Sequence, residues 1–523
     1  MIIAAAARAA VEMRVNQPNI LILMADQLTA GALPAYGNRV AKTPHIDALA
    51  AAGVVFDSFY CNSPLCAPSR FSFMAGRLPA QIGAYDNAAE FGAQVPTFAH
   101  HLRAAGYQTA LSGKMHFCGP DQLHGFEERL TTDIYPADFG WTPDWERFEH
   151  RPSWYHDMNS VAQAGPCTRT NQVDFDDEVV YAARQKLFDL ARSRDRRPFC
   201  LVVSMTHPHD PYVVPQAYWD RYEGVDIDMP KVSITPEQLD PHSRRIRHVI
   251  GLELQPVTQD QVRAARRAYY GAVSYVDDQI GALRAALRDS GFERDTIVLV
   301  LADHGDMLGE RGLWYKMNFF EPACRIPLIV HAPGRFSARR VPGSASLLDL
   351  LPTLCDFAGV DPAATGVPFD GASLLPALRG EPGRDEVIGE YLGEAAIAPM
   401  VMIRRGRYKF VHTPVDPDQL YDLAADPLEL NNLAAEPAQQ ERVAEFRREV
   451  ARRWDLPALH QAVLASQRRR HLVYRALRTG RFAPWDFQPL RDASRAYIRN
   501  DQDLPDLEAM ARFPSIGKSP DAR

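Results

Sequence analysis

The sequence predicts an α/β protein with a large, mostly parallel sheet flanked by helices and a smaller antiparallel subdomain near the C-terminus. Three observations predict this fold. Short apolar runs alternate with helical patterns from residue 19 to about residue 375, which is the order that builds βαβ units. The first run, residues 20–24, is apolar on both faces, as a strand covered by helices on both sides is. After Gly359 the pattern changes to short strands joined by turns.

The elements follow in order along the chain. Residues 20–24 form a strand that ends in Asp26, and Thr43 and Pro44 begin a helix that ends near Gly53. The later elements are a strand from residue 54, a capped helix at 97–106, strands at 107–111, 199–205 and 296–301, and a long helix at 262–287. Each of these last three strands runs into polar residues. Open α/β sheets bind ligands at such strand ends.

The C-terminal part has a different texture. Residues 401–403 and 408–411 predict a hairpin with a turn at Arg405 and Gly406, and a polar helix follows at 437–454. From residue 459 the chain is rich in Arg and aromatic residues without a strong core period, so we expect it to cover the main body or to contact a neighbouring subunit. The predicted division is an N-terminal extension (1–16), a catalytic domain (17–385), an antiparallel subdomain (386–458) and a tail (459–523).

Composition narrows the classes of function. The 523 residues carry 58 Lys and Arg against 65 Asp and Glu, a net charge of −7, which does not favour binding to nucleic acid. No apolar run approaches the length of a membrane span, so no membrane partner is expected. Residues 1–16 lack the basic start of a secretory leader. The seven cysteines are an odd, widely spaced set, which favours a reducing, cytoplasmic location.

The most informative segment contains Cys66, followed by Pro68, Ser69 and Arg70. Pro68 suits the first turn of a helix that ends at Gly76. Cys66 would then lie at the helix N-terminus, where free N–H groups favour an anion. A lone cysteine is more often buried and inert, so the helix position alone does not establish a function.

The segment Cys66-Ala67-Pro68-Ser69-Arg70, with the later Ala75-Gly76-Arg77, resembles the signature of type I sulfatases of the alkaline phosphatase superfamily. Further motifs of that family recur in order at residues 19–26, 106–116, 302–306, 316, 349–353 and 420–427. In this family the cysteine is oxidised to formylglycine by a formylglycine-generating enzyme, and the hydrated aldehyde is the nucleophile. The resemblance therefore implies the sulfatase fold and hydrolysis of a small-molecule sulfate ester.

The resemblance also implies one divalent metal ion. Its expected ligands are Asp26, Gln27, Asp303, His304 and the hydrated aldehyde derived from Cys66. Carboxylate and amide oxygens suit a hard cation. Gln27 stands where most sulfatases carry Asp, which removes one negative charge and leaves Ca²⁺ and Mn²⁺ both open.

The other catalytic roles follow from the same resemblance. The cations expected to neutralise the sulfuryl oxygens are Arg70, Lys114 and Lys316. His116 matches the base that takes a proton as sulfate is released. His209 or His207 would protonate the leaving group, and the family's His-x-Pro pattern favours His209. Asn87 is a candidate donor to a sulfate oxygen, and a role in its turn is the alternative.

Longer stretches resemble one subgroup, the choline sulfatases, at residues 112–116, 119–128, 131–136, 206–212, 314–318 and 484–486. The implied reaction converts choline-O-sulfate to choline and inorganic sulfate. A trimethylammonium group donates no hydrogen bond, so aromatic faces and a carboxylate hold it. The predicted cage is Trp141, His156 and Glu394. Choline is a poor leaving group, so its expulsion needs a proton donor.

The same resemblance implies a homo-oligomer, a dimer or a tetramer, in which the tail acids Asp501, Asp503 and Asp506 reach a neighbour's pocket. Two other functions remain open at this stage. The first is a phosphonate monoester or phosphodiester hydrolase, which shares the cysteine motif and the metal site. The second is a non-catalytic binder of quaternary ammonium compounds, in which Cys66 stays an unmodified thiol.

Overall fold

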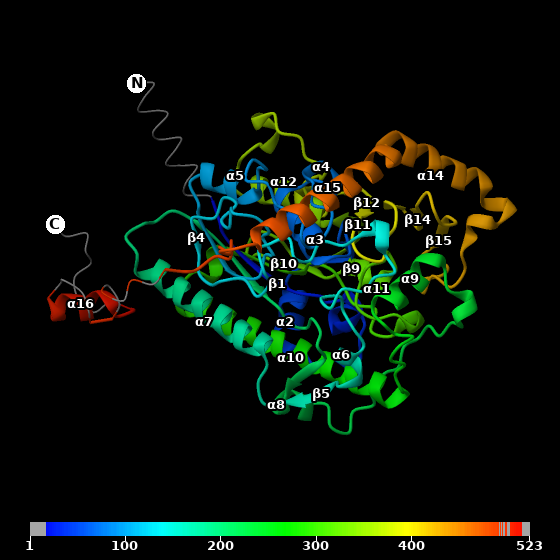
Figure 1. Ribbon diagram of the computed structural model, residues 1–523. Helices are drawn as coiled ribbons and strands as arrows, with labels where there is room; N and C mark the ends of the chain where they lie inside the picture. Colours follow the sequence, from blue (N-terminus) through cyan, green and yellow to red (C-terminus); the bar gives the residue numbers. More distant parts are fainter. Residues whose placement is uncertain (1–16, 491, 493, 495–496, 499–502, 515–523) are drawn as a thin grey trace.

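The computed structural model describes residues 17–490, 492, 494, 497–498 and 503–514 (Figure 1). The predicted extension at 1–16 and the tail residue Asp501 lie outside these residues.

The main sheet is built around β1 (Asn19–Ala25), which pairs in parallel with β8 (Thr296–Ala302) on one side and β6 (Phe199–Met205) on the other. Beyond β6 lie β3 (Gln108–Gly113) and β4 (Glu128–Arg129), also parallel. Beyond β8 the described strands are β10 (Leu328–His331), β2 (Val54–Tyr60), β11 (Arg339–Ser346) and the short β9 (Arg325–Ile326). β10 is antiparallel to both of its neighbours, so the sheet is mostly but not wholly parallel.

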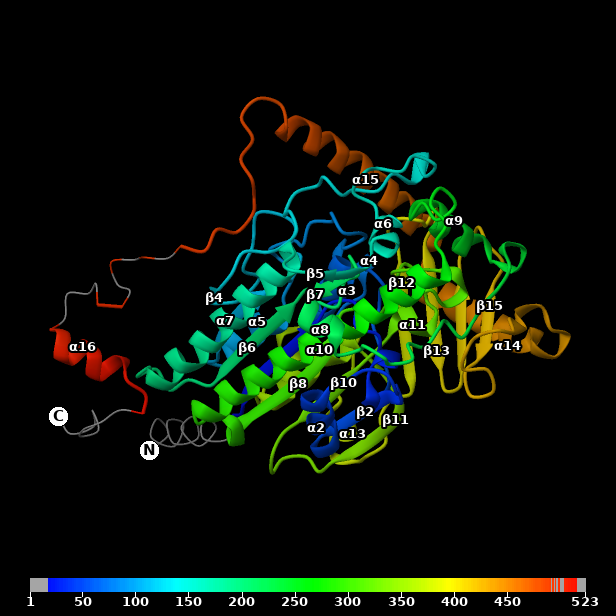
Figure 2. The same ribbon diagram turned by 90° about the horizontal axis from the view of Figure 1, so that it is seen from below.

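Helices cover both faces of this sheet (Figures 1 and 2). One layer contains α2 (Pro44–Ala52), α7 (Asn171–Arg192) and α10 (Gln259–Asp289), and the other contains α3 (Cys66–Ala75), α5 (Phe98–Ala104) and α12 (Leu350–Phe357). Because both faces are covered, β1 is apolar from residue 20 to residue 25, and these residues are at most 2% exposed. The shorter helices are α4 (Pro79–Ile82), α6 (Asn159–Ala162), α8 (Gln216–Asp220), α9 (Pro241–Val249), α11 (Glu321–Cys324) and α13 (Leu375–Arg379), and β5 (Gly165–Cys167) pairs with β7 (Val213–Pro215).

A second, antiparallel sheet is formed by β12 (Glu386–Tyr391), β13 (Met400–Arg405), β14 (Tyr408–His412) and β15 (Gln419–Asp422). The predicted hairpin turn is present, with Arg405 opposite Tyr408 and Gly406 at a φ of 56°. α14 (Gln440–Arg453) packs on this sheet, and the rings of Phe410 and Phe446 lie 5.2 Å apart. The predicted fold class is confirmed; the division at residues 385 and 458 stays a prediction.

The start of the predicted tail is a long helix, α15 (Leu456–Leu477), which the sequence did not indicate. Its buried positions towards the middle of the helix are Val463, Ser466, Gln467 and Arg470, spaced as one helical face. Three of these four side chains are polar, so no apolar period marks the helix. α15 crosses the same side of the molecule as α3, whereas α16 (Leu504–Ala511) is drawn apart from the main body (Figures 1 and 2).

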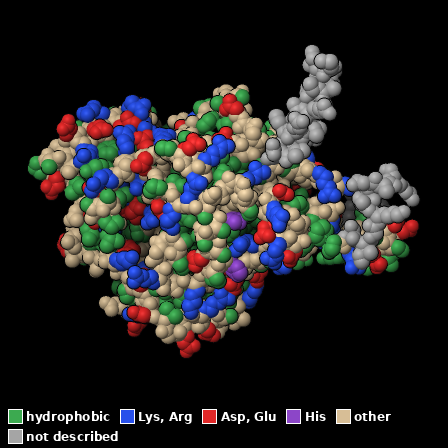
Figure 3. Space-filling model, turned by 180° about the vertical axis from the view of Figure 1, so that it is seen from behind, with side chains coloured by type: hydrophobic (Ala, Val, Ile, Leu, Met, Phe, Trp, Pro, Cys, Tyr) green, Lys and Arg blue, Asp and Glu red, His purple; other side chains and the backbone are tan. Residues whose placement is uncertain are grey.

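The face seen from behind carries acidic and basic side chains that are intermingled (Figure 3). Within the described residues, no helix combines the length and the apolar character that crossing a membrane requires.

Candidate active site

The two predicted metal-binding aspartates meet at one edge of the sheet. Asp26 directly follows β1 and Asp303 directly follows β8, and the register of these neighbouring parallel strands pairs Ala25 with Ala302. Both carboxylates are fully buried. The order of the strands therefore brings the two aspartates together. It also brings Gln27 next to Asp303, 276 positions later in the chain: the Gln27 N–H donates a 3.0 Å hydrogen bond to Asp303 Oδ1.

Cys66 is the first residue of α3, so the predicted helix begins two residues before Pro68. Leu65 at the N-cap position has no side chain that could cap the helix. Asn87 supplies this function from another loop, because its Oδ1 accepts a 3.0 Å hydrogen bond from the Ala67 N–H. The structure thus places Asn87 next to Cys66, with its oxygen engaged by the helix N-terminus.

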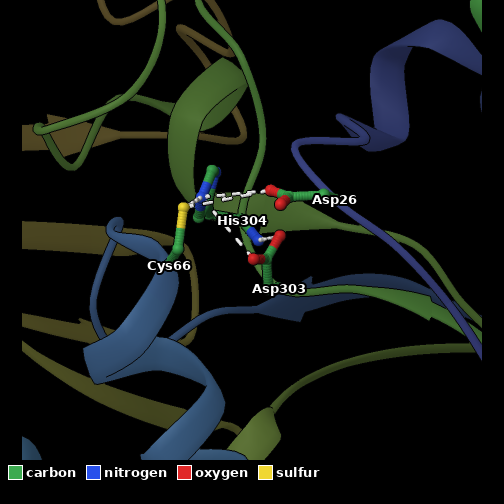
Figure 4. A group of neighbouring side chains, drawn as sticks. All are labelled: Asp26, Cys66, Asp303 and His304. Atoms are coloured by element: carbon green, nitrogen blue, oxygen red, sulfur yellow. Dashed lines mark hydrogen bonds and ion pairs between the residues drawn. The ribbon is translucent and has the colours of Figure 1, made fainter. Parts of the chain in front are cut away.

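Four predicted side chains converge on one point: Asp26, Cys66, Asp303 and His304 (Figure 4). One ligand atom from each lies within 4.8 Å of the others. His304 Nε2 is 3.2 Å from Cys66 Sγ and 3.7 Å from a carboxylate oxygen of each aspartate. The donors are carboxylate oxygens and an imidazole beside the position of the nucleophile, a set that suits a divalent cation.

Two buried cations compensate the charge of the carboxylates. Arg70 Nε lies 2.8 Å from Asp303 Oδ2, and its Nη1 donates to the Lys114 carbonyl oxygen at 2.7 Å. Lys114 Nζ pairs with Asp26. Burial alone would raise the pKa of Asp26, but Lys114, followed by smaller contributions that include Arg70, holds it well below its ordinary value. Arg70 therefore lies against the two carboxylates.

The Cys66 thiol also lies close to buried positive charges. Burial alone would raise its pKa, but Lys114 and Lys316 outweigh that effect and lower the pKa to about 6. By contrast, burial raises the pKa of the Cys61 thiol well above the usual value. Among these two neighbouring cysteines, only Cys66 faces positive charge.

Gln27 has a positive φ of 62° and turns its side chain towards a second polar group. Its Oε1 accepts a 2.7 Å hydrogen bond from Lys316 Nζ, and its Nε2 donates to Asp306 at 2.7 Å and to Asp210 at 3.3 Å. The predicted ligand atom of Gln27 therefore contacts Lys316, beside the four converging groups.

The two candidate leaving-group histidines lie in different surroundings. His209 Nε2 is 2.9 Å from Lys316 Nζ. His207 Nδ1 instead lies 2.7 Å from a carboxylate oxygen of Asp176, where both side chains are buried. The geometry therefore brings His209, and not His207, next to the predicted catalytic lysine.

His116 is almost fully buried, and its side chain interacts with that of Cys66. Burial lowers its pKa below the ordinary value, against the opposing effect of Cys66. Its ring centroid lies 5.0 Å from that of Tyr135 and 5.8 Å from that of Trp141. His116 therefore stands between the cysteine and an aromatic wall.

That wall continues from Trp141 to Trp154, whose rings are stacked with centroids 6.1 Å apart, and then to Tyr155, edge-on at 4.4 Å. Tyr155 lies within electrostatic range of Glu394. Glu394 is 4% exposed, and its Oε2 has no hydrogen-bond partner in the part of the chain that is described. Burial raises its pKa to about 7.

The third predicted cage residue, His156, contacts a different set of side chains. His156 Nδ1 is 3.2 Å from Asp210, and its ring stacks on Tyr315 at 4.5 Å and lies 5.4 Å from the His209 ring. His156 thus lies beside His209, and it shares the carboxylate of Asp210 with Gln27.

Sequence reasoning missed several residues that contact the site: Asp86, Tyr135, Trp145, Asp210, Asp306 and Arg470. Tyr135 and Asp210 stand inside segments that carried the family resemblance, which is a usable signal. Arg470 had none, because a single arginine in an Arg-rich segment looks like surface.

Solved structures share this architecture. A phosphonate monoester hydrolase of Agrobacterium radiobacter superposes with a TM-score of 0.66 at 25% identity, over 85% of this chain and 96% of that protein. A 2-O GAG sulfatase superposes with a TM-score of 0.64 at 24% identity, over 88% and 94% respectively. The second likeness shows the fold alone.

Sequence comparison is more specific. A choline-sulfatase of Rhizobium meliloti (strain 1021) is 49% identical over 510 residues, which is 96% of this chain and 99% of that protein. An arylsulfatase of Clostridium perfringens is 27% identical over 78% of this chain and 90% of its own. Family models match at residues 18–360 (Sulfatase), 309–454 (N-sulphoglucosamine sulphohydrolase, C-terminal) and 461–513 (Choline sulfatase enzyme C terminal). The chain therefore belongs to the sulfatase family.

Proposed function

We propose that this sulfuric ester hydrolase converts choline-O-sulfate to choline and inorganic sulfate, with Cys66 in its formylglycine form as the nucleophile. The observation that carries the choline assignment is Glu394, a buried carboxylate whose Oε2 has no hydrogen-bond partner among the described residues and which interacts electrostatically with Tyr155, the ring that packs on Trp154. A buried unpaired carboxylate is costly unless a cation completes it. A trimethylammonium group beside aromatic faces fits that requirement.

The donor set fits a divalent cation, because three buried side chains and the residue-66 position offer ligand atoms at one point. The ion would be held by Asp26, Asp303 and His304. The amide oxygen of Gln27 would join them once its hydrogen bond to Lys316 is broken. Bound there, the ion would polarise the sulfate ester and acidify the hydroxyl nucleophile that formylglycine provides. Because amide and carboxylate donors suit both, Ca²⁺ and Mn²⁺ are the proposed ions.

The protein's own residues account for the rest of the step. Arg70 fixes the orientation of Asp303, since its Nε and Nη1 are both engaged at 2.7–2.8 Å. Lys114 and Lys316 point their ammonium groups towards the Cys66 region and would face the sulfate oxygens. His116, which is buried beside Cys66 and has a lowered pKa, is available as the base that takes a proton beside position 66.

The proton for choline comes from the opposite side. His209 and Lys316 lie 2.9 Å apart, so one proton is shared between a lysine and an imidazole. An alkoxide such as choline's needs this proton as the S–O bond breaks. The His207–Asp176 contact is buried away from Lys316, which supports His209 in this role.

Three further points are proposals of the same kind. The seven free cysteines support a reducing, cytoplasmic location and maturation by a formylglycine-generating enzyme. The exposed apolar side chains of the tail, among them Leu490, Leu504 and Met510, support a homo-oligomer, a dimer or a tetramer. Asp503 and Asp506 are candidates for a contact with a neighbouring subunit.

Two measurements test the proposal. Mass spectrometry of the peptide that contains Cys66 should show the mass loss of aldehyde formation, whereas an intact thiol with choline binding would support a non-catalytic binder. Turnover of choline sulfate, an aryl sulfate and a phosphodiester should be compared side by side. The highest kcat/KM on the phosphodiester would replace the proposal by a phosphonate monoester or phosphodiester hydrolase.

A further inference from the structure

α15 reaches the active-site region with a buried charge. Arg470 is only 5% exposed, although it lies on a helix at the outside of the molecule (Figure 1). A buried guanidinium is costly unless it is paired and hydrogen-bonded. The groups that pair with Arg470 therefore indicate what the helix does.

The first partner is Asp86, which is fully buried. Arg470 Nη1 and Nη2 each lie 2.6 Å from one of its carboxylate oxygens, a bidentate pair. The same carboxylate accepts a 3.0 Å hydrogen bond from the Ala88 N–H, and the Asp86 carbonyl accepts one from the Ala89 N–H at 3.1 Å. Asp86 thus holds the turn formed by residues 86–89, and Arg470 holds Asp86.

Asn87 stands inside that turn. Its Oδ1 accepts from the Ala67 N–H at the start of α3, directly after Cys66. A displacement of the turn would therefore move both the Asn87 carboxamide and the cap of the helix that presents residue 66. Arg470 acts on this site only through Asp86 and Asn87.

The second partner is Thr142. Its Oγ1 lies 3.1 Å from Arg470 Nη1 and donates to the Phe139 carbonyl oxygen at 2.8 Å. Thr142 is the next residue after Trp141, which begins the aromatic wall. One guanidinium therefore joins the turn of Asn87 to the loop of Trp141.

The same helix also contacts the Glu394 side of the pocket. Gln467 Oε1 accepts a 3.0 Å hydrogen bond from the Trp145 N–H, and Trp145 Nε1 donates to the Gly393 carbonyl oxygen at 2.9 Å. Gly393 directly precedes Glu394. The buried polar face of α15 is thus bonded directly to the turn of Asp86 and to the segment from Thr142 to Trp145, and through Trp145 to the segment of Gly393.

We propose that Arg470 is a positioning residue of the active site, which holds the turn of Asn87 and the loop of Trp141 in one fixed arrangement. The effect on the turn of Asn87 should influence the hydrolysis of any sulfate ester. The effect on the loop of Trp141 rests on the proposed choline specificity. Because Arg470 touches no reacting atom, its effect is on geometry.

The test compares choline sulfate with 4-nitrophenyl sulfate in two variants. Arg470→Lys keeps the positive charge beside Asp86 but cannot reach two carboxylate oxygens and Thr142 together. We expect kcat/KM to fall on the order of 100-fold for choline sulfate, as a misplacement of about 1 Å can cause, and about tenfold for the aryl sulfate. Thr142→Val leaves the Arg470–Asp86 pair in place and removes the second contact, together with the hydrogen bond to Phe139 within the loop of Trp141, so we expect a rise in KM for choline sulfate alone.

The matched control is Arg475→Lys, the same change at an exposed position of the same helix, which should equal the wild type. Melting temperature and the formylglycine content of each variant are measured alongside the kinetics. A loss that is equal for both substrates and proportional to the folded fraction would assign Arg470 a purely structural role and overturn the proposal.

Two further outcomes are decisive. If Arg470→Lys folds and stays within threefold of the wild type on both substrates, the proposal is wrong. If the wild type hydrolyses the aryl sulfate but not choline sulfate, the proposed function is wrong. The kinetics of the variants on the aryl sulfate then still decide whether Arg470 positions Asn87. Should Arg470→Lys not fold, unchanged KM values in Thr142→Val would refute the effect on the loop of Trp141.

Discussion

The proposed metal centre and the proposed choline pocket are built in different ways. The centre is formed at the ends of β1 and β8 and at the first residue of α3, and its charges face one another: Lys114 pairs with Asp26, and Arg70 with Asp303. The pocket is formed by loops that carry Trp141, Trp154 and Glu394, and the carboxylate of Glu394 has an oxygen without a partner.

This difference has a functional meaning. In the centre, backbone register between neighbouring strands fixes the groups, so the chemistry is the same for any sulfate ester. In the proposed pocket, side-chain hydrogen bonds from α15 hold the loops, and the proposal is that the cation of the substrate completes the site beside Glu394. Substitutions in the centre should therefore affect all substrates, and substitutions in the pocket should affect choline sulfate selectively.

The largest effect is expected at the nucleophile. Cys66→Ala should show no turnover of any sulfate ester above background, because the hydroxyl nucleophile cannot form. Its melting temperature should stay within a few degrees of the wild type. The matched control is Cys200→Ala, a buried cysteine in β6, which should keep its activity. Turnover by Cys66→Ala would refute the nucleophile assignment.

Loss of a metal ligand should come next. Asp303→Asn removes one anionic donor and the ion-pair partner of Arg70. We expect kcat/KM to fall on the order of 1,000-fold for choline sulfate and aryl sulfate alike, which corresponds to the several kcal/mol that a metal supplies. Elemental analysis after dialysis should show less bound metal. Asp295→Asn, exposed at the other end of the same strand, should match the wild type in both readouts.

A substitution of His209 should affect substrates according to how much their leaving group needs a proton. His209→Gln should lower kcat for choline sulfate about 100-fold or more, the usual contribution of a general acid. Nitrophenolate leaves without a proton, so the aryl sulfate should lose little. His207→Gln should instead lower stability, because it breaks the buried contact with Asp176. Equal losses on both substrates for His209→Gln would assign that histidine a different role.

The resemblance to the sulfatase family singled out the residues of the proposed metal centre, and a simple rule explains why they meet. Asp26 and Asp303 end continuous apolar strands, and parallel strands bring their carboxyl ends to one edge. Cys66 lies before a proline that suits a helix start. These signals are local in sequence, and the sheet converts them into proximity.

The pocket was only partly predictable. A choline cage of Trp141, His156 and Glu394 stays a prediction: Trp141 stacks with Trp154, Glu394 is buried, and His156 contacts Asp210. The contact of Arg470 with Asp86 joins residues 384 positions apart through polar side chains, so no apolar period reveals it. α15 was missed for the same reason.

The smallest effect is expected at Glu394. Glu394→Gln keeps the shape of the side chain and removes its charge, so we expect KM for choline sulfate to rise about tenfold, as loss of one cation contact would cause. The aryl sulfate has no cation and should change less than twofold. The matched control is Glu381→Gln, an exposed glutamate after α13, which should leave both KM values unchanged.

The pH dependence sharpens this test. Burial raises the pKa of Glu394 to about 7 from an ordinary value of 4.5, so the folded protein keeps a proton there that the unfolded chain has already lost. The contribution of Glu394 to the free energy of unfolding should therefore fall by about 3 kcal/mol between pH 4.5 and 7, and this fall should be absent in Glu394→Gln. Over the range near pH 7 the carboxylate gains its charge, so KM of the wild type for choline sulfate should fall as pH rises, while that of the variant stays level. A wild-type KM that does not depend on pH near 7 would show that Glu394 does not bind the cation.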